Sequence, residues 1–297
     1  MLYPSVLSSH LPPVEPLSSS EIRAAVRLAL EEDVGSGDVT TSSTVPADFG
    51  CRAVMRAREP LIAAGIELAA ETFRQVSSAT EIKLVCKDGD HVPKGGILLN
   101  VTGPARGVLT AERVALNFVQ RLSGIATLTA QYVAAVRGTS ARILDTRKTT
   151  PGLRRFEKHA VACGGGTNHR MGLFDMVLIK DNHLAALKQQ VANPIAAAVA
   201  NARKSHPQLK IEVEADTLDQ VRHAVEARAD FVLLDNMPPS QMRTAVGLCR
   251  GRALTEASGG ITLATVRAAA ETGVDFISLG AITHSARAVD IGLDFEM

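Results

Sequence analysis

Basic side chains gather in one stretch of the sequence that contains few acids. They are Arg147, Lys148, Arg154, Lys158, His169, Arg170 and Lys180. Arginine binds a carboxylate or phosphate through two parallel hydrogen bonds, whereas lysine supplies a compact positive charge. This mixture predicts a ligand that carries several anionic groups.

Acidic residues end two of the apolar runs that follow. Glu214 closes one run and Asp235 closes the next. Carboxylates beside a phosphate site can hold Mg²⁺ together with the ligand's own oxygens, or accept hydrogen bonds from ribose hydroxyls. For one residue alone, such as Lys180, a salt bridge inside the fold is the simpler interpretation. Because buried charges are costly unless they pair or bind a ligand, charges at successive strand ends favour a polar binding site.

Small residues end the last two apolar runs, in the segments Ser258-Gly259-Gly260 and Leu279-Gly280-Ala281. Their free backbone N–H groups predict a phosphate grip, which barrels often place between the final two strands. The glycine-rich segment 163–170 matches neither a Walker loop nor a dinucleotide fingerprint. We interpret it as a turn that presents His169 and Arg170.

The spacing of the apolar runs indicates which elements position these residues. Six runs end at Asp145, Lys180, Glu214, Asp235, Ser258 and Gly280, with gaps of 35, 34, 21, 23 and 22 residues. Each gap holds about one strand and one helix, a rhythm typical of a parallel α/β barrel whose strand ends face the site. Six visible runs favour an incomplete barrel of about six or seven strands, over 126–285, rather than eight.

The chain before the barrel predicts a smaller α+β sandwich-like domain over 18–125. Helices are expected from a Ser20 cap onward and over 66–76, and strands over 51–58, 82–86 and 97–101. Alternating apolar residues at 289–295 predict a strand that returns to this domain, so 286–297 joins it.

A further helix is expected over 111–122, capped by Thr110 and ended by Gly124. Its residues Arg113, Asn117 and Arg121 form a polar stripe, which either faces a site or faces solvent.

Composition excludes several classes of protein. The 297 residues carry a formal charge of +1 and include 3% aromatic residues and no Trp, so nucleic-acid and lipid binding are not expected. Four dispersed cysteines form no metal-binding or disulfide pattern. Residues 1–17 are rich in Pro and Ser and are expected to be flexible. They resemble no secretory signal, and no apolar run is long enough for a membrane span, so a cytoplasmic protein is predicted.

At this point the sequence resembles one family strongly over nearly its whole length. The matching segments are EDVGSGDVT (32–40), ERVALN (112–117), LSGIAT (122–127), DTRKTTPGLR (145–154), GGGTNHR (164–170), IKDNH (179–183), EVE (212–214), LDN (234–236) and SGG (258–260). They are similar to those of quinolinate phosphoribosyltransferases, also called carboxylating nicotinate-nucleotide pyrophosphorylases.

The resemblance implies transfer of phosphoribose from phosphoribosyl pyrophosphate to quinolinate, with Mg²⁺, yielding nicotinate mononucleotide, pyrophosphate and CO₂ for NAD biosynthesis. It implies that Arg113, Arg147, Lys148, His169, Arg170 and Lys180 meet the substrates' anionic groups, and that Glu214 and Asp235 serve ribose and metal. The 5′-phosphate would lie against Ser258-Gly259-Gly260 and Leu279-Gly280-Ala281. Lys148, Lys180, Glu214 and Asp235 would be the catalytic residues. Arg113 would enter a neighbouring subunit's site, which requires a homodimer or a higher homo-oligomer.

Three alternatives stay open at this stage. Lys180 could form a Schiff base, although neighbouring acids would keep it protonated and unreactive. The chain could be a family relative that uses another pyridine or base. It could also be a non-catalytic regulator that binds a phosphorylated metabolite.

Overall fold

The computed structural model describes residue 11 and residues 15–296. Most of the segment 1–17, for which flexibility is predicted, lies outside the described residues. Contacts divide the chain into two compact units. The barrel unit holds residues 131–149 and 166–281, and the sheet unit holds 15–130, 150–165 and 282–297.

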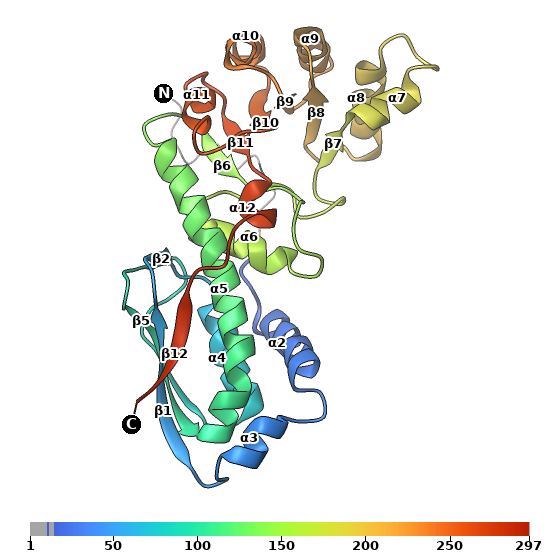
Figure 1. Cartoon of the computed structure of the whole chain (residues 1–297). Coiled ribbons are helices and arrows are strands. Elements are labelled where there is room, and N and C mark those ends of the chain that lie inside the picture. Colours follow the sequence, from blue (N-terminus) through green and yellow to red (C-terminus); the bar gives the residue numbers. More distant parts are fainter. Residues whose placement is uncertain (1–10, 12–14, 297) are drawn as a thin grey trace. The chain divides into compact units, whose positions relative to one another are not determined.

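The sheet unit is built on an antiparallel sheet with the strand order β12-β1-β5-β3 (Figure 1). Its strands are β1 (Gly50–Ala57), β3 (Glu81–Leu84), β5 (Ile97–Pro104) and β12 (Ile291–Glu296), with a separate pair β2 (Leu61–Ile62) and β4 (His91–Val92). Ala53 of β1 faces Phe295 of β12. The predicted return of the last strand to this unit is therefore confirmed.

Helices α4 (Ile66–Val76) and α5 (Ala105–Ala135) pack on this sheet and supply helical residues of its buried core. The other helices of the unit are α2 (Ser19–Val34), α3 (Val39–Thr44), α6 (Arg154–Cys163) and most of α12 (Ala281–His284). Met55 of β1, Phe73 of α4 and Val119 of α5 belong to one buried apolar cluster. Ser18, rather than Ser20, caps α2, because Ser18 and Glu21 form a reciprocal capping box.

The prediction that Gly124 ends a helix capped by Thr110 is wrong. Helix α5 runs without interruption from Ala105 to Ala135, and Thr110 and Gly124 lie inside it. A Cβ added at Gly124 would lie 2.0 Å from the carbonyl oxygen of Arg287. The glycine is therefore needed for a close approach of two backbones, which a helix interior accepts at a cost of about 1 kcal/mol.

The barrel unit contains six parallel strands in the order β6-β11-β10-β9-β8-β7. They are β6 (Arg142–Leu144), β7 (Val177–Ile179), β8 (Ile211–Ala215), β9 (Phe231–Asp235), β10 (Leu254–Ser258) and β11 (Phe276–Ser278). The helices between them are α7 (Asp181–Leu187), α8 (Pro194–Ser205), α9 (Leu218–Glu226), α10 (Pro239–Cys249) and α11 (Val266–Ala270).

The barrel is open between its first two strands. β11 pairs with β6, but β6 and β7 are the two ends of the sheet within the described residues. An isolated parallel bridge joins Leu144 of β6 to Thr167. This confirms the prediction of an incomplete barrel. A seventh strand would pair with β6 at this position, but the glycine-rich segment forms only one β-bridge there.

No helix among the described residues combines the length and apolar character that a membrane crossing requires.

Candidate active site

A cavity of about 280 Å³ lies at the carboxyl ends of the barrel strands. Eight of the predicted site residues line it: Arg147, Lys148, His169, Arg170, Lys180, Glu214, Asp235 and Ser258. Asp235 and Ser258 are the last residues of β9 and β10, and Lys180 directly follows β7. Parallel strands gather their ends at one edge of a barrel, and this brings together residues that are distant in the sequence.

The segment after Thr167 is held in place by Asp145, which is fully buried. The Asp145 carboxylate accepts hydrogen bonds from the Asn168 side chain at 2.5 Å and from the His169 backbone N–H at 2.8 Å. The backbone N–H of Thr167 donates to the carbonyl of Ile143 in β6. These bonds fix His169 and Arg170 at the mouth of the barrel, as the sequence interpretation of this turn requires.

His169 lies between two buried acids. Its Nε2 atom is 3.1 Å from Glu212 Oε2 and 3.4 Å from Glu256 Oε2. Burial lowers the pKa of His169, but the carboxylates of Glu256 and Glu212 outweigh burial and raise this pKa to about 10. The two acids therefore favour the positively charged form of the ring.

The two acids beneath His169 differ from each other in protonation. Burial, together with the charge of Glu256, raises the pKa of Glu212 to about 7. Burial also acts against ionisation of Glu256, but the His169 imidazolium prevails and lowers the pKa of Glu256. Glu256 is therefore the ionised partner, and Glu212 shares a proton with the site near neutral pH.

Arg170 provides a second buried cation. It donates to the carbonyl of Met176 at 2.9 Å and is 6% exposed. Burial and the nearby charge of Arg147 lower the pKa of Arg170. Two guanidinium groups that repel each other at the wall of a cavity favour the binding of an anion between them.

The outer wall of the cavity carries the more accessible charges. Lys180 forms an ion pair with Glu214, and the side chain of Lys180 is 46% exposed. Lys148 is exposed as well. A long flexible cation at a cavity rim can follow the charge of a ligand, whereas the buried cations are fixed.

The two small-residue segments continue the chain directly beyond the cavity. Gly259 has φ +92°, and a Cβ there would lie 2.2 Å from Asn236 Oδ1. Asn236 itself has φ 53°, and its side chain donates to Asp235. Gly260, Gly280 and Ala281 are accessible or partly so, whereas Leu279 is buried and its backbone N–H already donates to the Leu144 carbonyl at 3.0 Å.

The structure also supplies site residues that the sequence interpretation missed. Asp145, Glu212 and Glu256 support the cavity from below, and Ser278 lines it. Glu212 and Glu256 carried a usable signal, because an acid inside an apolar strand needs a buried partner. Arg113 belongs to the sheet unit, on α5, and its role stays a prediction.

A larger hollow of about 640 Å³ lies at the opposite ends of the barrel strands. Phe231 and Leu254, the first residues of β9 and β10, line it. Its acid Asp230 already forms ion pairs with Arg203 and Lys210. Such pairs stabilise this end of a barrel, whereas the predicted site residues line the smaller cavity.

Two family models match consecutive parts of the chain. The model described as "Quinolinate phosphoribosyl transferase, N-terminal domain" matches residues 38–123. The model described as "Quinolinate phosphoribosyl transferase, C-terminal domain" matches residues 125–294.

Individual proteins show the same similarity. The nicotinate-nucleotide pyrophosphorylase (carboxylating) of Mycobacterium leprae is 45% identical over 94% of this chain and 99% of its own length. The probable enzyme of that name from Bacillus subtilis is 44% identical over 90% of both chains. The solved nicotinate-nucleotide pyrophosphorylase from Francisella tularensis superposes with a TM-score of 0.90 and 38% identity, over 96% of this chain and 100% of that one.

Proposed function

This chain belongs to the quinolinate phosphoribosyltransferase family, and from that premise we propose how its barrel cavity carries out the reaction. The reaction joins quinolinate to the phosphoribosyl group of phosphoribosyl pyrophosphate and yields nicotinate mononucleotide, pyrophosphate and CO₂. One observation carries the proposal: five cationic residues and three carboxylates line a single small cavity at the strand ends. Both substrates are polyanions, and they need such a surface.

The buried cations bind quinolinate. Its two adjacent carboxylates match the guanidinium groups of Arg147 and Arg170, each of which can bind one carboxylate through two hydrogen bonds. The His169 imidazolium, whose pKa is raised to about 10, adds a third positive charge. Because Asp145 fixes His169 and the Met176 carbonyl fixes Arg170, these two side chains orient the pyridine nitrogen with little loss of entropy on binding.

Glu214 and Asp235 serve the ribose and the metal. Both carboxylates line the cavity, and their oxygens accept hydrogen bonds from ribose hydroxyls. Oxygen ligands also suit Mg²⁺, which binds through one or two carboxylates together with substrate phosphates. The donor set therefore fits the ion, which would neutralise charge on the diphosphate when bound.

The 5′-phosphate lies against the backbone of Ser258-Gly259-Gly260 and Leu279-Gly280-Ala281. Ser258 lines the cavity, and a side chain at Gly259 would collide with Asn236. A phosphate that approaches a backbone closely needs such small residues.

The chemistry requires positioning and charge rather than a covalent nucleophile. Departure of pyrophosphate leaves positive charge on the sugar, so the residues Lys148 and Lys180 act by stabilising the leaving anion. Attack by the ring nitrogen makes the pyridine cationic. The ring carbon that loses CO₂ keeps the electron pair of the broken C–C bond, which the cationic ring stabilises, and then takes up a proton from water. The amine of Lys180 is engaged in an ion pair with Glu214, which argues against a Schiff base.

This function is tested by incubating the protein with a panel of pyridine substrates. Quinolinate and phosphoribosyl pyrophosphate with Mg²⁺ should yield nicotinate mononucleotide and CO₂, detected by mass spectrometry. Turnover of nicotinate without turnover of quinolinate would overturn the substrate assignment. Tight binding of phosphoribosyl pyrophosphate without turnover of any pyridine would instead favour a regulator.

The binding roles of the buried arginines have a separate test. Arg170→Ala or Arg147→Ala removes a charge-assisted pair and should weaken quinolinate binding by about 1.5–3 kcal/mol. Calorimetric titration measures this change, with Arg228→Ala as a control, because Arg228 lines the opposite hollow. Unchanged affinity in the cavity variants would remove the assigned role.

Arg113 completes the site of a second subunit, and the active unit is a homodimer or a larger homo-oligomer. Arg113→Ala and Lys148→Ala should each be nearly inactive alone. When the two are mixed under subunit exchange, heterodimers rebuild one site, and about a quarter of wild-type sites should return. If mass measurement shows heterodimers and no activity returns, Arg113 does not act in a neighbouring subunit.

A further inference from the structure

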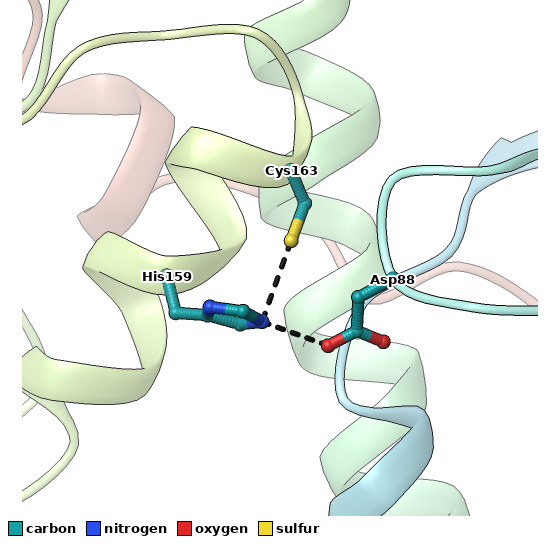
Figure 2. A group of neighbouring side chains, drawn as sticks. All are labelled: Asp88, His159 and Cys163. Atoms are coloured by element: carbon teal, nitrogen blue, oxygen red, sulfur yellow. Dashed lines mark hydrogen bonds and ion pairs between the residues drawn. The ribbon is translucent and has the colours of Figure 1, made fainter. Parts of the chain in front are cut away.

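Three side chains of different chemistry meet in the sheet unit, and none of them lines the barrel cavity. They are Asp88, His159 and Cys163 (Figure 2). His159 Nε2 lies 2.8 Å from Asp88 Oδ2 and 3.5 Å from Cys163 Sγ. All three donor atoms lie within 4.8 Å of one another. The proposed reaction uses none of them.

Local structure explains why the three atoms converge. His159 and Cys163 are four residues apart on α6, so their side chains share one face of the helix. Asp88 stands in a tight turn between β3 and β4, where the Lys87 N–H donates to the Asp90 carboxylate at 3.0 Å. Figure 2 shows the imidazole ring between the thiol and the carboxylate, with Sγ and Oδ2 directed at the same nitrogen.

The carboxylate of Asp88 is already oriented by a second bond. Its other oxygen, Oδ1, accepts a hydrogen bond of 3.0 Å from the backbone N–H of Ile66, at the start of α4. That bond leaves Oδ2 to face His159. An outer hydrogen bond that orients a ligand oxygen is a regular feature of metal sites in proteins.

We propose that Asp88, His159 and Cys163 form a binding site for a divalent ion of the zinc class, which links α6 to the turn at Asp88. One thiolate, one imidazole and one carboxylate are ligands that Zn²⁺ accepts together. With Zn–N of about 2.0–2.1 Å and Zn–S of about 2.3 Å, a tetrahedral ion sets nitrogen and sulfur about 3.5 Å apart. The observed separation of Nε2 and Sγ already has this value.

Only the carboxylate has to move when the ion binds. The same geometry sets nitrogen and oxygen about 3.4 Å apart, so the Asp88 to His159 bond of 2.8 Å opens by a small side-chain rotation. The three residues are partly exposed, so the ion has access, and a water molecule can take the fourth position.

Binding of the ion requires a neutral imidazole at His159 and a deprotonated thiol at Cys163, so it releases protons and involves no change of oxidation state.

The direct test is titration of the chelator-treated full chain with Co²⁺ and Zn²⁺. Co²⁺ should produce one equivalent of sulfur-to-metal charge-transfer absorption, and Zn²⁺ should displace it. Cys163→Ser should abolish the absorption, and His159→Gln should weaken Zn²⁺ binding by at least about 10–100-fold, the loss typical of an outer partner alone. Cys163→Asp replaces sulfur with oxygen, and should keep weaker Zn²⁺ binding without the absorption.

Matched controls separate this site from adventitious binding. Cys51→Ser alters another partly exposed cysteine of the same unit, and His206→Gln alters an exposed histidine of the barrel unit. Both should bind Zn²⁺ as the wild type does. Ions held at the barrel carboxylates would be insensitive to His159→Gln.

A variant that folds poorly could lose Zn²⁺ binding for that reason alone, so the melting temperature is measured with and without Zn²⁺. Zn²⁺ should raise the melting temperature of the wild type and of Cys51→Ser, but not that of Asp88→Asn. Equal Zn²⁺ affinity in the wild type and in all variants of the three residues would overturn the proposal. So would a wild-type Co²⁺ spectrum without a sulfur band.

Discussion

Each unit of the molecule contains a histidine held as an imidazolium by acidic neighbours, yet the two settings have opposite consequences. His169 of the barrel unit is 5% exposed and faces two buried acids. His159 of the sheet unit has a side chain that is 29% exposed and faces one partly exposed acid and a thiol. The pKa of each imidazole is raised to about 10.

Equal pKa values therefore do not mean equal roles. Around His169 the charges are out of water, so removing one partner leaves the others without compensation. Around His159 water screens the pair, and the energy at stake is small. The buried acids hold His169 in place at the barrel mouth, whereas the accessible cluster around His159 can exchange its proton for another cation.

The largest expected effect comes from breaking the buried cluster. His169→Gln leaves Glu212 and Glu256 without a positive partner and should lower the free energy of unfolding by about 3–5 kcal/mol at pH 8. At low pH both acids take up protons, so the loss should shrink. Urea unfolding at pH 5 and pH 8 measures this difference. His206→Gln, at an exposed histidine of the same unit, serves as control, and an equal midpoint in His169→Gln and wild type would contradict the ion-pair model.

The two acids beneath His169 should respond unequally. Glu256→Gln removes the ionised partner and should cost about 1.5–3 kcal/mol, the value of a hydrogen bond to a charged group. Glu212→Gln replaces a group that holds a proton near neutral pH and should cost less. If both substitutions lower the free energy of unfolding equally, Glu212 is not the acid that holds the proton.

The pH dependence of the free energy of unfolding should also distinguish Glu212 from Glu256. The folded pKa of Glu212 is raised from 4.5 to about 7, so its stability contribution is full below pH 4.5 and is lost as pH rises through about 7. Glu212→Gln should remove that decline from the plot of unfolding free energy against pH.

The sequence predicted the residues that line the barrel cavity better than the buried acids that hold them in place. Lys180, Glu214, Asp235 and Ser258 were found because each ends an apolar run, and strand ends converge in any parallel barrel. Glu212 and Glu256 were not assigned a role, since the sequence does not show which buried acid faces which cation. Periodicity also placed 66–76 correctly as α4.

Contacts between distant segments account for most of what the sequence did not reveal. Gly124 was taken as a helix end because glycine disfavours helices, but the backbone at Arg287 requires it there. Likewise Cys163 and Asp88 carry no motif in sequence. Their meeting depends on how the turn after β3 packs against α6, which no local pattern encodes.

Substitutions in the partly exposed cluster of Asp88, His159 and Cys163 should change the free energy of unfolding less, as long as no metal is bound. Asp88→Asn removes the main cause of the raised His159 pKa, so this pKa should fall towards 6.5. The wild-type contribution to stability is full below pH 6.5 and is lost as pH rises through about 10. Because the pair is partly exposed, the loss at pH 7 should be about 1 kcal/mol or less. NMR titration of the His159 ring measures the shift, and an unchanged pKa would show that Asp88 is not its cause.

The smallest effect is expected from Cys163→Ser without metal. Cys163 is partly exposed and contributes one long contact to His159, so the free energy of unfolding should change by about 0.5 kcal/mol or less. With Zn²⁺ at 100 times its dissociation constant, binding to the folded chain alone adds about 2.7 kcal/mol to the wild type. The difference between wild type and Cys163→Ser should therefore widen several-fold when Zn²⁺ is added, whereas the difference between wild type and Cys51→Ser should not. Urea unfolding of the three chains, with chelator and with Zn²⁺, measures both differences. Zn²⁺ could instead stabilise Cys163→Ser as much as it stabilises the wild type. In that case Asp88 and His159 form only a solvent-screened ion pair, and the raised pKa of His159 is due to Asp88 alone.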